Sequence, residues 1–96
     1  MPTLEPVPEA VRLSRKIQPE PFVAVFNLYL DMRTSRLILV EAEYAPSQDV
    51  AKILRAEIGK WRFKKSAANS GDVLRVPVVM YGRVENADSL IVEAAD

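Results

Sequence analysis

The sequence predicts a small α+β domain: a three-stranded antiparallel sheet, one long amphipathic helix packed on one face and a short N-terminal helix, in the order α-β-β-α-β. Three stretches alternate apolar and polar residues as strands do, and one stretch repeats apolar residues at helical spacing. The 96 residues, 49% hydrophobic, suit one domain with a modest core. We place it at residues 8–84, after a proline-rich linker at 1–7. An acidic tail at 85–96 follows, with room for a short extra strand.

The composition argues against several classes of function. Thirteen Lys and Arg balance thirteen Asp and Glu, so the chain lacks the positive field that nucleic-acid binding usually exploits. It has no Cys and no His, which removes thiolate zinc sites, Cys nucleophiles and His-based catalysis. No apolar run approaches the roughly 20 residues that span a bilayer, and the start does not look like a signal peptide. We therefore expect a binding module, not an enzyme, with no cofactor, no metal and no nucleic-acid partner.

The N-terminal segment is rich in proline. Pro2, Pro6 and Pro8 predict an extended linker up to about residue 8. Pro8 also suits the first turn of a helix, where its missing N–H costs nothing. A short helix is predicted over residues 9–17, because its apolar residues fall at helical spacing: Ala10, Leu13 and Ile17.

Residues 22–43 predict an antiparallel hairpin. In the first strand the even positions from Phe22 to Leu30 alternate with the odd ones, so Phe26 and Leu28 should face the core. A polar turn at 31–36 separates this strand from a second β-rich run at 37–43. Because the turn has no glycine, a tight two-residue loop is not expected.

The main helix is predicted to follow Pro46. Ser47 is a good N-cap, and Asp49 suits the first turn because the helix dipole favours negative charge there. One side carries an apolar stripe made of Val50, Ile53, Leu54, Ile58 and Trp61. Glu57 lies inside this stripe, so we expect its carboxylate to reach the rim or to pair with a neighbouring Arg. A catalytic role is disfavoured, because no second acid or base accompanies it.

A third strand is predicted over residues 72–81, with Leu74, Val76, Val78 and Met80 toward the core. Pro77 has no backbone N–H, so this strand should have one unpaired edge. Residues of the same parity as Pro77 should offer their backbone groups to that edge. An extended partner segment is expected to bind along residues 73–83. The predicted partner-binding residues are Arg75, Pro77, Val79, Tyr81 and Arg83.

The motif Trp61-Arg62-Phe63 follows the helix stripe and precedes a Val-rich strand. With the strand order, it resembles the C-terminal domain of TonB-family energy transducers, whose helix ends in Trp-Arg-Tyr or Trp-Arg-Phe. Leu54 and Ile58 fall at that family's apolar positions, seven and three before the Trp. Residues 71–79 match its Gly-x-x-Val-x-Val-x-Val entry into the last strand. The implied structural core comprises Phe26, Leu28, Leu54, Ile58, Trp61, Phe63, Val76 and Val78.

The sequence departs from that family at three places. Glu57 stands where the family has a small residue, and residues 31–32 open a longer turn than its usual Asp-Gly. Glu20 and Pro21 replace the glycine that usually opens the first strand. These departures bear on close kinship more than on the fold.

The resemblance implies a function in the periplasm of a Gram-negative bacterium, in a protein anchored in the inner membrane by an N-terminal helix. Such a domain captures the TonB box of outer-membrane receptors by strand addition to its last strand and drives import of siderophores, haem or vitamin B12. Inner-membrane motor proteins are possible partners through that anchor, which we expect to be missing from this sequence. The oligomeric state stays open, including a homodimer that exchanges its last strand.

Two other classes of function are alternatives to the energy-transducer prediction. The alternative is a structural or oligomerisation module of a cell-envelope secretion or assembly complex, which would use the same exposed edge for self-association. A small hydrolytic enzyme using Ser or a carboxylate pair is disfavoured, because no nucleophile has an identifiable base.

Overall fold

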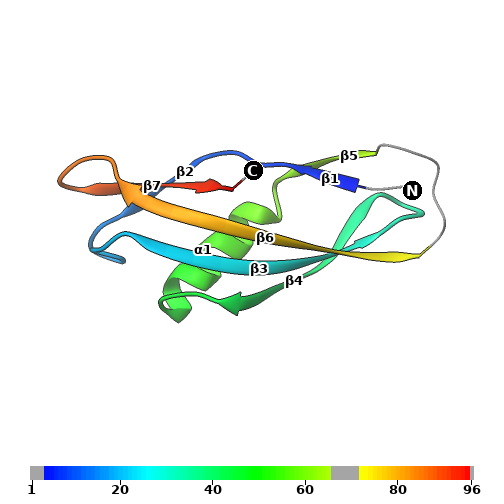
Figure 1. Cartoon of the computed structure of the whole chain (residues 1–96), viewed down its shortest axis with the longest axis horizontal. Helices are drawn as coiled ribbons and strands as arrows, with labels where there is room; N and C mark the ends of the chain where they lie inside the picture. Colours follow the sequence, from blue (N-terminus) through cyan, green and yellow to red (C-terminus); the bar gives the residue numbers. More distant parts are fainter. Residues whose placement is uncertain (1–3, 66–71, 96) are drawn as a thin grey trace.

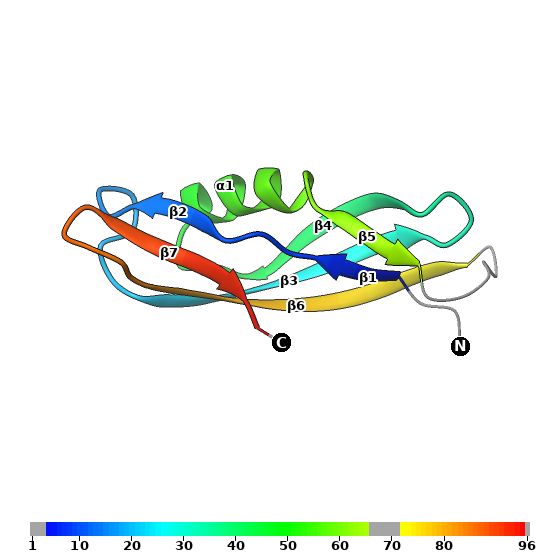
Figure 2. The same ribbon diagram turned by 90° about the horizontal axis from the view of Figure 1, so that it is seen from above.

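The structure, a computed structural model, describes residues 4–65 and 72–95. Its elements are β1 (Leu4–Val7), β2 (Val11–Ser14), β3 (Phe22–Asp31), β4 (Arg36–Tyr44), α1 (Gln48–Ile58), β5 (Arg62–Lys65), β6 (Val73–Val84) and β7 (Ser89–Ala94). Five strands form one antiparallel sheet in the order β2-β7-β6-β3-β4, and β1 pairs with β5 in a separate two-stranded sheet. Figure 1 shows the long sheet with α1 crossing it obliquely, and Figure 2 shows α1 and the β1–β5 pair on the same side of the sheet.

The predicted fold class, a three-stranded sheet with one long helix and a short N-terminal helix, is wrong. The sheet has five strands in place of three, and α1, the single helix of seven or more residues among those described, has 11 residues. The central arrangement of two hairpin strands, one helix and a returning strand is present as β3, β4, α1 and β6. The two strands added to the large sheet, β2 and β7, come from the two ends of the chain, and the unpredicted strand β5 follows α1.

The predicted N-terminal helix is replaced by strand β2. Leu13 is 2% exposed and points into the core, whereas Ile17, a member of the predicted helical stripe, is 41% exposed. Val11 to Ser14 pair with Val92 to Ser89 of β7. A free helix of nine residues is marginal in water, whereas pairing with β7 satisfies the backbone and buries Leu13. The segment predicted as a linker contains β1, which pairs with β5.

The β3–β4 hairpin is confirmed, and its connection is longer than two residues. Asp31 is the register partner of Arg36, so four residues form the loop. The Ser35 N–H donates to the Asp31 carbonyl (2.8 Å), and the Arg33 N–H donates to the Asp31 carboxylate (2.8 Å). Ser35 takes the left-handed conformation (φ 59°), which lets the loop close without glycine.

Helix α1 begins as predicted and ends earlier than its apolar stripe. The Ser47 hydroxyl oxygen accepts a hydrogen bond from the Val50 N–H (3.1 Å), which satisfies one orphan donor. After Ile58 the chain tightens, and the Trp61 N–H donates to the Ile58 carbonyl (3.0 Å). Trp61 is still only 7% exposed and belongs to the core. Glu57 is half-buried and pairs with Lys60 (3.4 Å), not with an Arg.

The core lies between α1 and the inner face of the sheet. Six of the predicted core residues are buried: Phe26, Leu28, Leu54, Ile58, Trp61 and Val78. The other two, Phe63 and Val76, are partly buried and pack against this cluster. Gly82 lies opposite Phe22, and a Cβ at position 82 would overlap the Phe22 ring. Strand pairing therefore requires glycine at this position while the ring keeps its place.

Candidate peptide-binding slot

Strand β6 is paired along most of its length on one side and along a shorter part of it on the other. β3 pairs with Val73 to Gly82, whereas β7 pairs only with Met80 to Val84. The Ala95 N–H extends this contact by donating to the Val79 carbonyl (2.7 Å). Within the described part of the chain, Val73 to Val78 have no strand on their outer side. The expected free edge is thus present over this half of β6 and wrong for Met80 to Val84.

The direction of the backbone groups agrees with the parity argument from Pro77. Pro77 is opposite Asn27 of β3 and has no N–H to donate to it. The Val79 carbonyl points away from β3, toward Ala95, so residues of the same parity direct their backbone groups outward. The open half of β6 therefore offers the N–H groups of Val73 and Arg75 and the carbonyls of Val73, Arg75 and Pro77.

A groove occupies the space beside this open half. It has a volume of about 340 Å³, and β1 and the end of β7 supply its remaining walls. We call it the slot; it is lined by Pro6, Pro8, Val76, Pro77, Val78, Val79, Ala94 and Ala95. Prolines stand on both sides of it, and proline on an edge limits indiscriminate strand pairing because it cannot donate a ladder hydrogen bond. The side chains that line the slot are all apolar.

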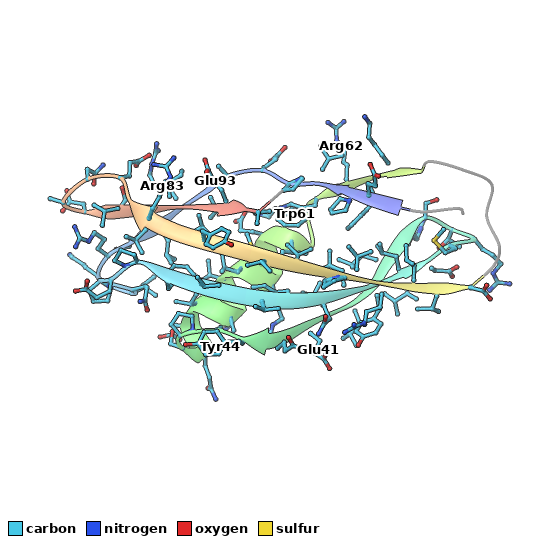
Figure 3. All side chains as sticks on the ribbon, viewed as in Figure 1. Glu41, Tyr44, Trp61, Arg62, Arg83 and Glu93 are labelled. Atoms are coloured by element: carbon cyan, nitrogen blue, oxygen red, sulfur yellow. The ribbon has the colours of Figure 1, made fainter. Side chains whose placement is uncertain are left out.

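The five predicted partner-binding residues fall in three different settings. Pro77 and Val79 line the slot. Arg75 lies on the open half of β6, but its guanidinium donates to the Asn27 side-chain oxygen (3.1 Å), away from the slot. Tyr81 and Arg83 lie in the half that β7 covers, with Arg83 3.6 Å from Glu93. Figure 3 shows the Arg83 and Glu93 side chains close together over β6 and β7.

Sequence reasoning missed a polar cluster around Asn27. Asn27 is 3% exposed although it lies on the sheet face opposite α1. Its amide nitrogen donates to Glu41 (3.2 Å) and Glu43 (3.4 Å) of β4, and its oxygen accepts from Arg75. Buried polar groups require such partners. A single Asn between Phe26 and Leu28 was the available signal, but its partners depend on strand register.

A second polar cluster closes the β6–β7 hairpin. The Arg12 guanidinium donates to both Glu85 carboxylate oxygens (2.6 and 3.2 Å), and the Ser89 hydroxyl donates to one of them (2.9 Å). These hydrogen bonds, with the Arg12 bond as the largest cause, lower the pKa of Glu85 from its usual range. The cluster ties β2 to the hairpin on the covered side of β6.

Over residues 4–65 and 72–95, no three Asp or Glu side chains gather as a metal site would need. None of the helices in that same part of the chain is long and apolar enough to cross a membrane.

No family model, curated protein or solved structure matches the chain. The resemblance to the TonB C-terminal domain therefore remains a prediction from the residues alone.

Proposed function

We propose that this chain is a protein-binding domain that captures an extended peptide in the slot. The observation that carries the proposal is the half-covered β6: its outer side is open over Val73 to Val78, and β7 stops at Ala94. A peptide there would continue the line of β7 and exchange main-chain hydrogen bonds with outward groups of Val73, Arg75 and Pro77. Each bond contributes only about 0.5–1.5 kcal/mol net, so a short peptide would bind weakly to moderately.

The finer form of this proposal follows from the resemblance given above. The peptide would be the TonB box of an outer-membrane receptor, and the domain would work in the periplasm as the receptor-binding part of an energy transducer. The open stretch belongs to the strand that follows the Trp61-Arg62-Phe63 motif, the one that the resemblance assigns to receptor binding. The slot supports peptide capture in general, and the choice of a TonB box rests on the resemblance.

The test is an amide-resolved NMR titration with TonB-box peptides and with one unrelated extended peptide. Capture predicts shifts concentrated on the amides of Val73, Arg75 and Val79. A peptide N-methylated at alternate amides should lose binding when the methyl groups face β6 and keep it when they face away. Binding of the unrelated peptide alone would retain peptide capture and reject the transducer role. No shifts at millimolar peptide would overturn both.

A second candidate function, an oligomerisation module, is favoured by the outer face of the sheet. Several large apolar side chains are exposed there, among them Val23 (42%), Tyr44 (59%) and Tyr81 (49%). Val23 is the register partner of Tyr81, and Val25 is the partner of both Tyr44 and Val79, so these residues form one patch. Contiguous exposed patches of this kind mark contact surfaces. Sedimentation of the wild type and of Tyr81→Ser at micromolar concentration tests it: a dimer that dissociates in the variant supports it, and a monomeric wild type rejects it.

A further inference from the structure

The edge of the sheet farthest from the slot carries a second surface. Strand β4 is the last strand in the sheet, so its outer side has no strand beside it among the described residues. The Asp31 carbonyl accepts a hydrogen bond from the Ser35 N–H on the β4 side, and Pro77 of β6 has no N–H to donate to Asn27. The backbone groups of the odd-numbered residues of β3 therefore point toward β4 and not toward β6. Glu41, the partner of Asn27, therefore directs its backbone inward. Its neighbours Val40 and Ala42 direct theirs outward.

Register irregularities limit this edge to a short window. The pairing of β3 with β4 shifts between Tyr29 and Leu30 and again between Val25 and Phe26. These bulges place the regular stretch of β4 at residues 39–42 and interrupt the ladder on either side. An added strand would therefore find only a few backbone partners here, and side-chain contacts must supply selectivity.

The outer face of this edge is acidic, whereas the inner face carries two cations and one carboxylate. On the outer face, Glu41 and Glu43 accept hydrogen bonds from Asn27, which holds both carboxylates over the sheet. Figure 3 shows Glu41 and Tyr44 projecting from β4 on this face. On the inner face, a groove of about 500 Å³ runs between Ala42 and α1. We call it the β4–α1 groove; its lining is Ala42, Gln48, Asp49, Ala51, Lys52 and Arg55.

Two cations that line this groove form no ion pair with any residue that the structure describes. The ion pairs seen in the described residues engage Arg12, Lys60 and Arg83. Lys52 and Arg55 are exposed and take part in none of them. They are three residues apart on one helix, so their side chains start about 5–6 Å from each other. Alternate residues of an extended strand are about 6.8 Å apart on one face, which is a comparable spacing.

We propose that β4 and the β4–α1 groove bind an acidic extended peptide. The peptide pairs with the outward backbone groups of Val40 and Ala42. Carboxylates at alternate positions face Lys52 and Arg55, and the intervening residues lie beside Leu39 on the outer face. This site is separate from the slot and does not depend on it.

A second copy of this chain is a poorer occupant of the same edge in two of the three symmetric registers that Val40 and Ala42 allow. If two β4 strands paired through Val40 and Ala42, Glu41 would lie opposite its own counterpart. If they paired through Ala42 with Ala42, Glu41 would lie opposite Glu43. Like charges directly opposite each other destabilise a strand pair. A peptide with carboxylates only on the groove side avoids this repulsion.

The test is a titration of the labelled chain with the peptide acetyl-Thr-Glu-Val-Glu-Val-Glu-Thr-amide and with its Gln-for-Glu analogue. The site predicts shifts on the amides of Val40 and Ala42, which the Gln analogue should produce only weakly. Replacing both cations (Lys52→Gln with Arg55→Gln) should weaken binding about fivefold, since each exposed pair contributes modestly. The matched control, Arg62→Gln with Lys64→Gln, removes equal charge from β5 and should change affinity by less than about twofold.

Three outcomes would overturn the proposal. Equal weakening by both double variants would mean that net charge alone attracts the peptide. Shifts confined to Val73 to Val79 would assign the acidic peptide to the slot. Full competition by inorganic phosphate at equal concentration would indicate an anion site that does not need a strand. Thermal unfolding of both double variants checks that they are folded before affinities are compared.

Discussion

The two halves of β6 differ in what covers them, although one continuous strand forms both. Met80 to Gly82 lie between β3 and β7, Arg83 and Val84 pair with β7 alone, and the buried side chains Leu90 and Val92 of β7 extend the core there. Val73 to Val78 have β3 on one side and no described strand on the other, and the slot lies beside the part of this stretch from Val76 onward. Val73 is 61% exposed, whereas Met80 is fully buried. The same alternating pattern thus forms a closed core where a second strand arrives and an open edge where it does not.

The largest expected effect is at the covered half. Leu90→Ala removes a fully buried side chain from β7 and should lower the free energy of unfolding by about 2–5 kcal/mol. The matched change in the open half, Val73→Ala, should alter it by less than about 0.5 kcal/mol, because Val73 is largely exposed. Urea unfolding of both variants measures the two values. Similar losses in the two variants would mean that the halves are packed alike.

The next effect concerns the β3–β6 pairing where β7 joins it. Gly82→Ala places a Cβ against the Phe22 ring and should cost about 1–3 kcal/mol of stability through overpacking. Gly59→Ala is the matched control, because Gly59 has a right-handed helical conformation (φ −61°) and only ordinary contacts around its Cβ position. That substitution should stabilise by about 0.4–1 kcal/mol. A neutral Gly82→Ala would show that the ring moves aside freely.

A smaller change probes the boundary between the halves. Ala95→Pro removes the N–H that donates to the Val79 carbonyl and should cost about 0.5–1.5 kcal/mol. The freed carbonyl lengthens the open edge by one acceptor, so a peptide in the slot should bind more tightly to this variant. Ala95→Gly keeps the N–H and serves as the control in the same titration. Weaker peptide binding by Ala95→Pro would argue that Ala95 belongs to the binding surface, not to its boundary.

The smallest effect is the pH dependence of the covered half. The pKa of Glu85 is lowered by its hydrogen bonds to Arg12 and Ser89. A carboxyl whose pKa falls on folding contributes stability above its unfolded value, about 4.3, and that contribution is lost as the pH falls through the folded pKa. Thermal unfolding between pH 7 and pH 3 should therefore show a shallower loss of stability in Glu85→Gln than in the wild type. If the stability of the two proteins fell equally between pH 7 and pH 3, Glu85 would not contribute to the pH dependence.

Local signals predicted the middle of the chain well. The N-cap at Ser47, the stripe through Leu54 and Ile58, and the alternation from Phe22 to Leu30 each depend on neighbouring residues, and each is confirmed. The short extra strand that was allowed for in the acidic tail is present as β7. The parity argument from Pro77 also gave the correct outward direction for the Val79 carbonyl.

The ends of the chain could not be predicted in the same way. Leu13 suits a helix stripe and a strand equally well, and only pairing with β7 decides between them. Coverage of Tyr81 and Arg83 depends on that same distant strand, so the sequence-predicted site extended too far along β6. The β4–α1 groove was not foreseen, because it requires knowing which side of β4 faces Lys52 and Arg55.

The central claim is that the outer side of β6 is open at one half and closed at the other. Amide hydrogen exchange of Arg75 and Tyr81 in the free protein tests it most directly, because both N–H groups point outward from the same strand. Exchange at Arg75 should be fast, since no strand covers it, and exchange at Tyr81 should be slow, since β7 pairs with it. Equal and strong protection of the two amides would contradict the open slot and the peptide capture proposed from it.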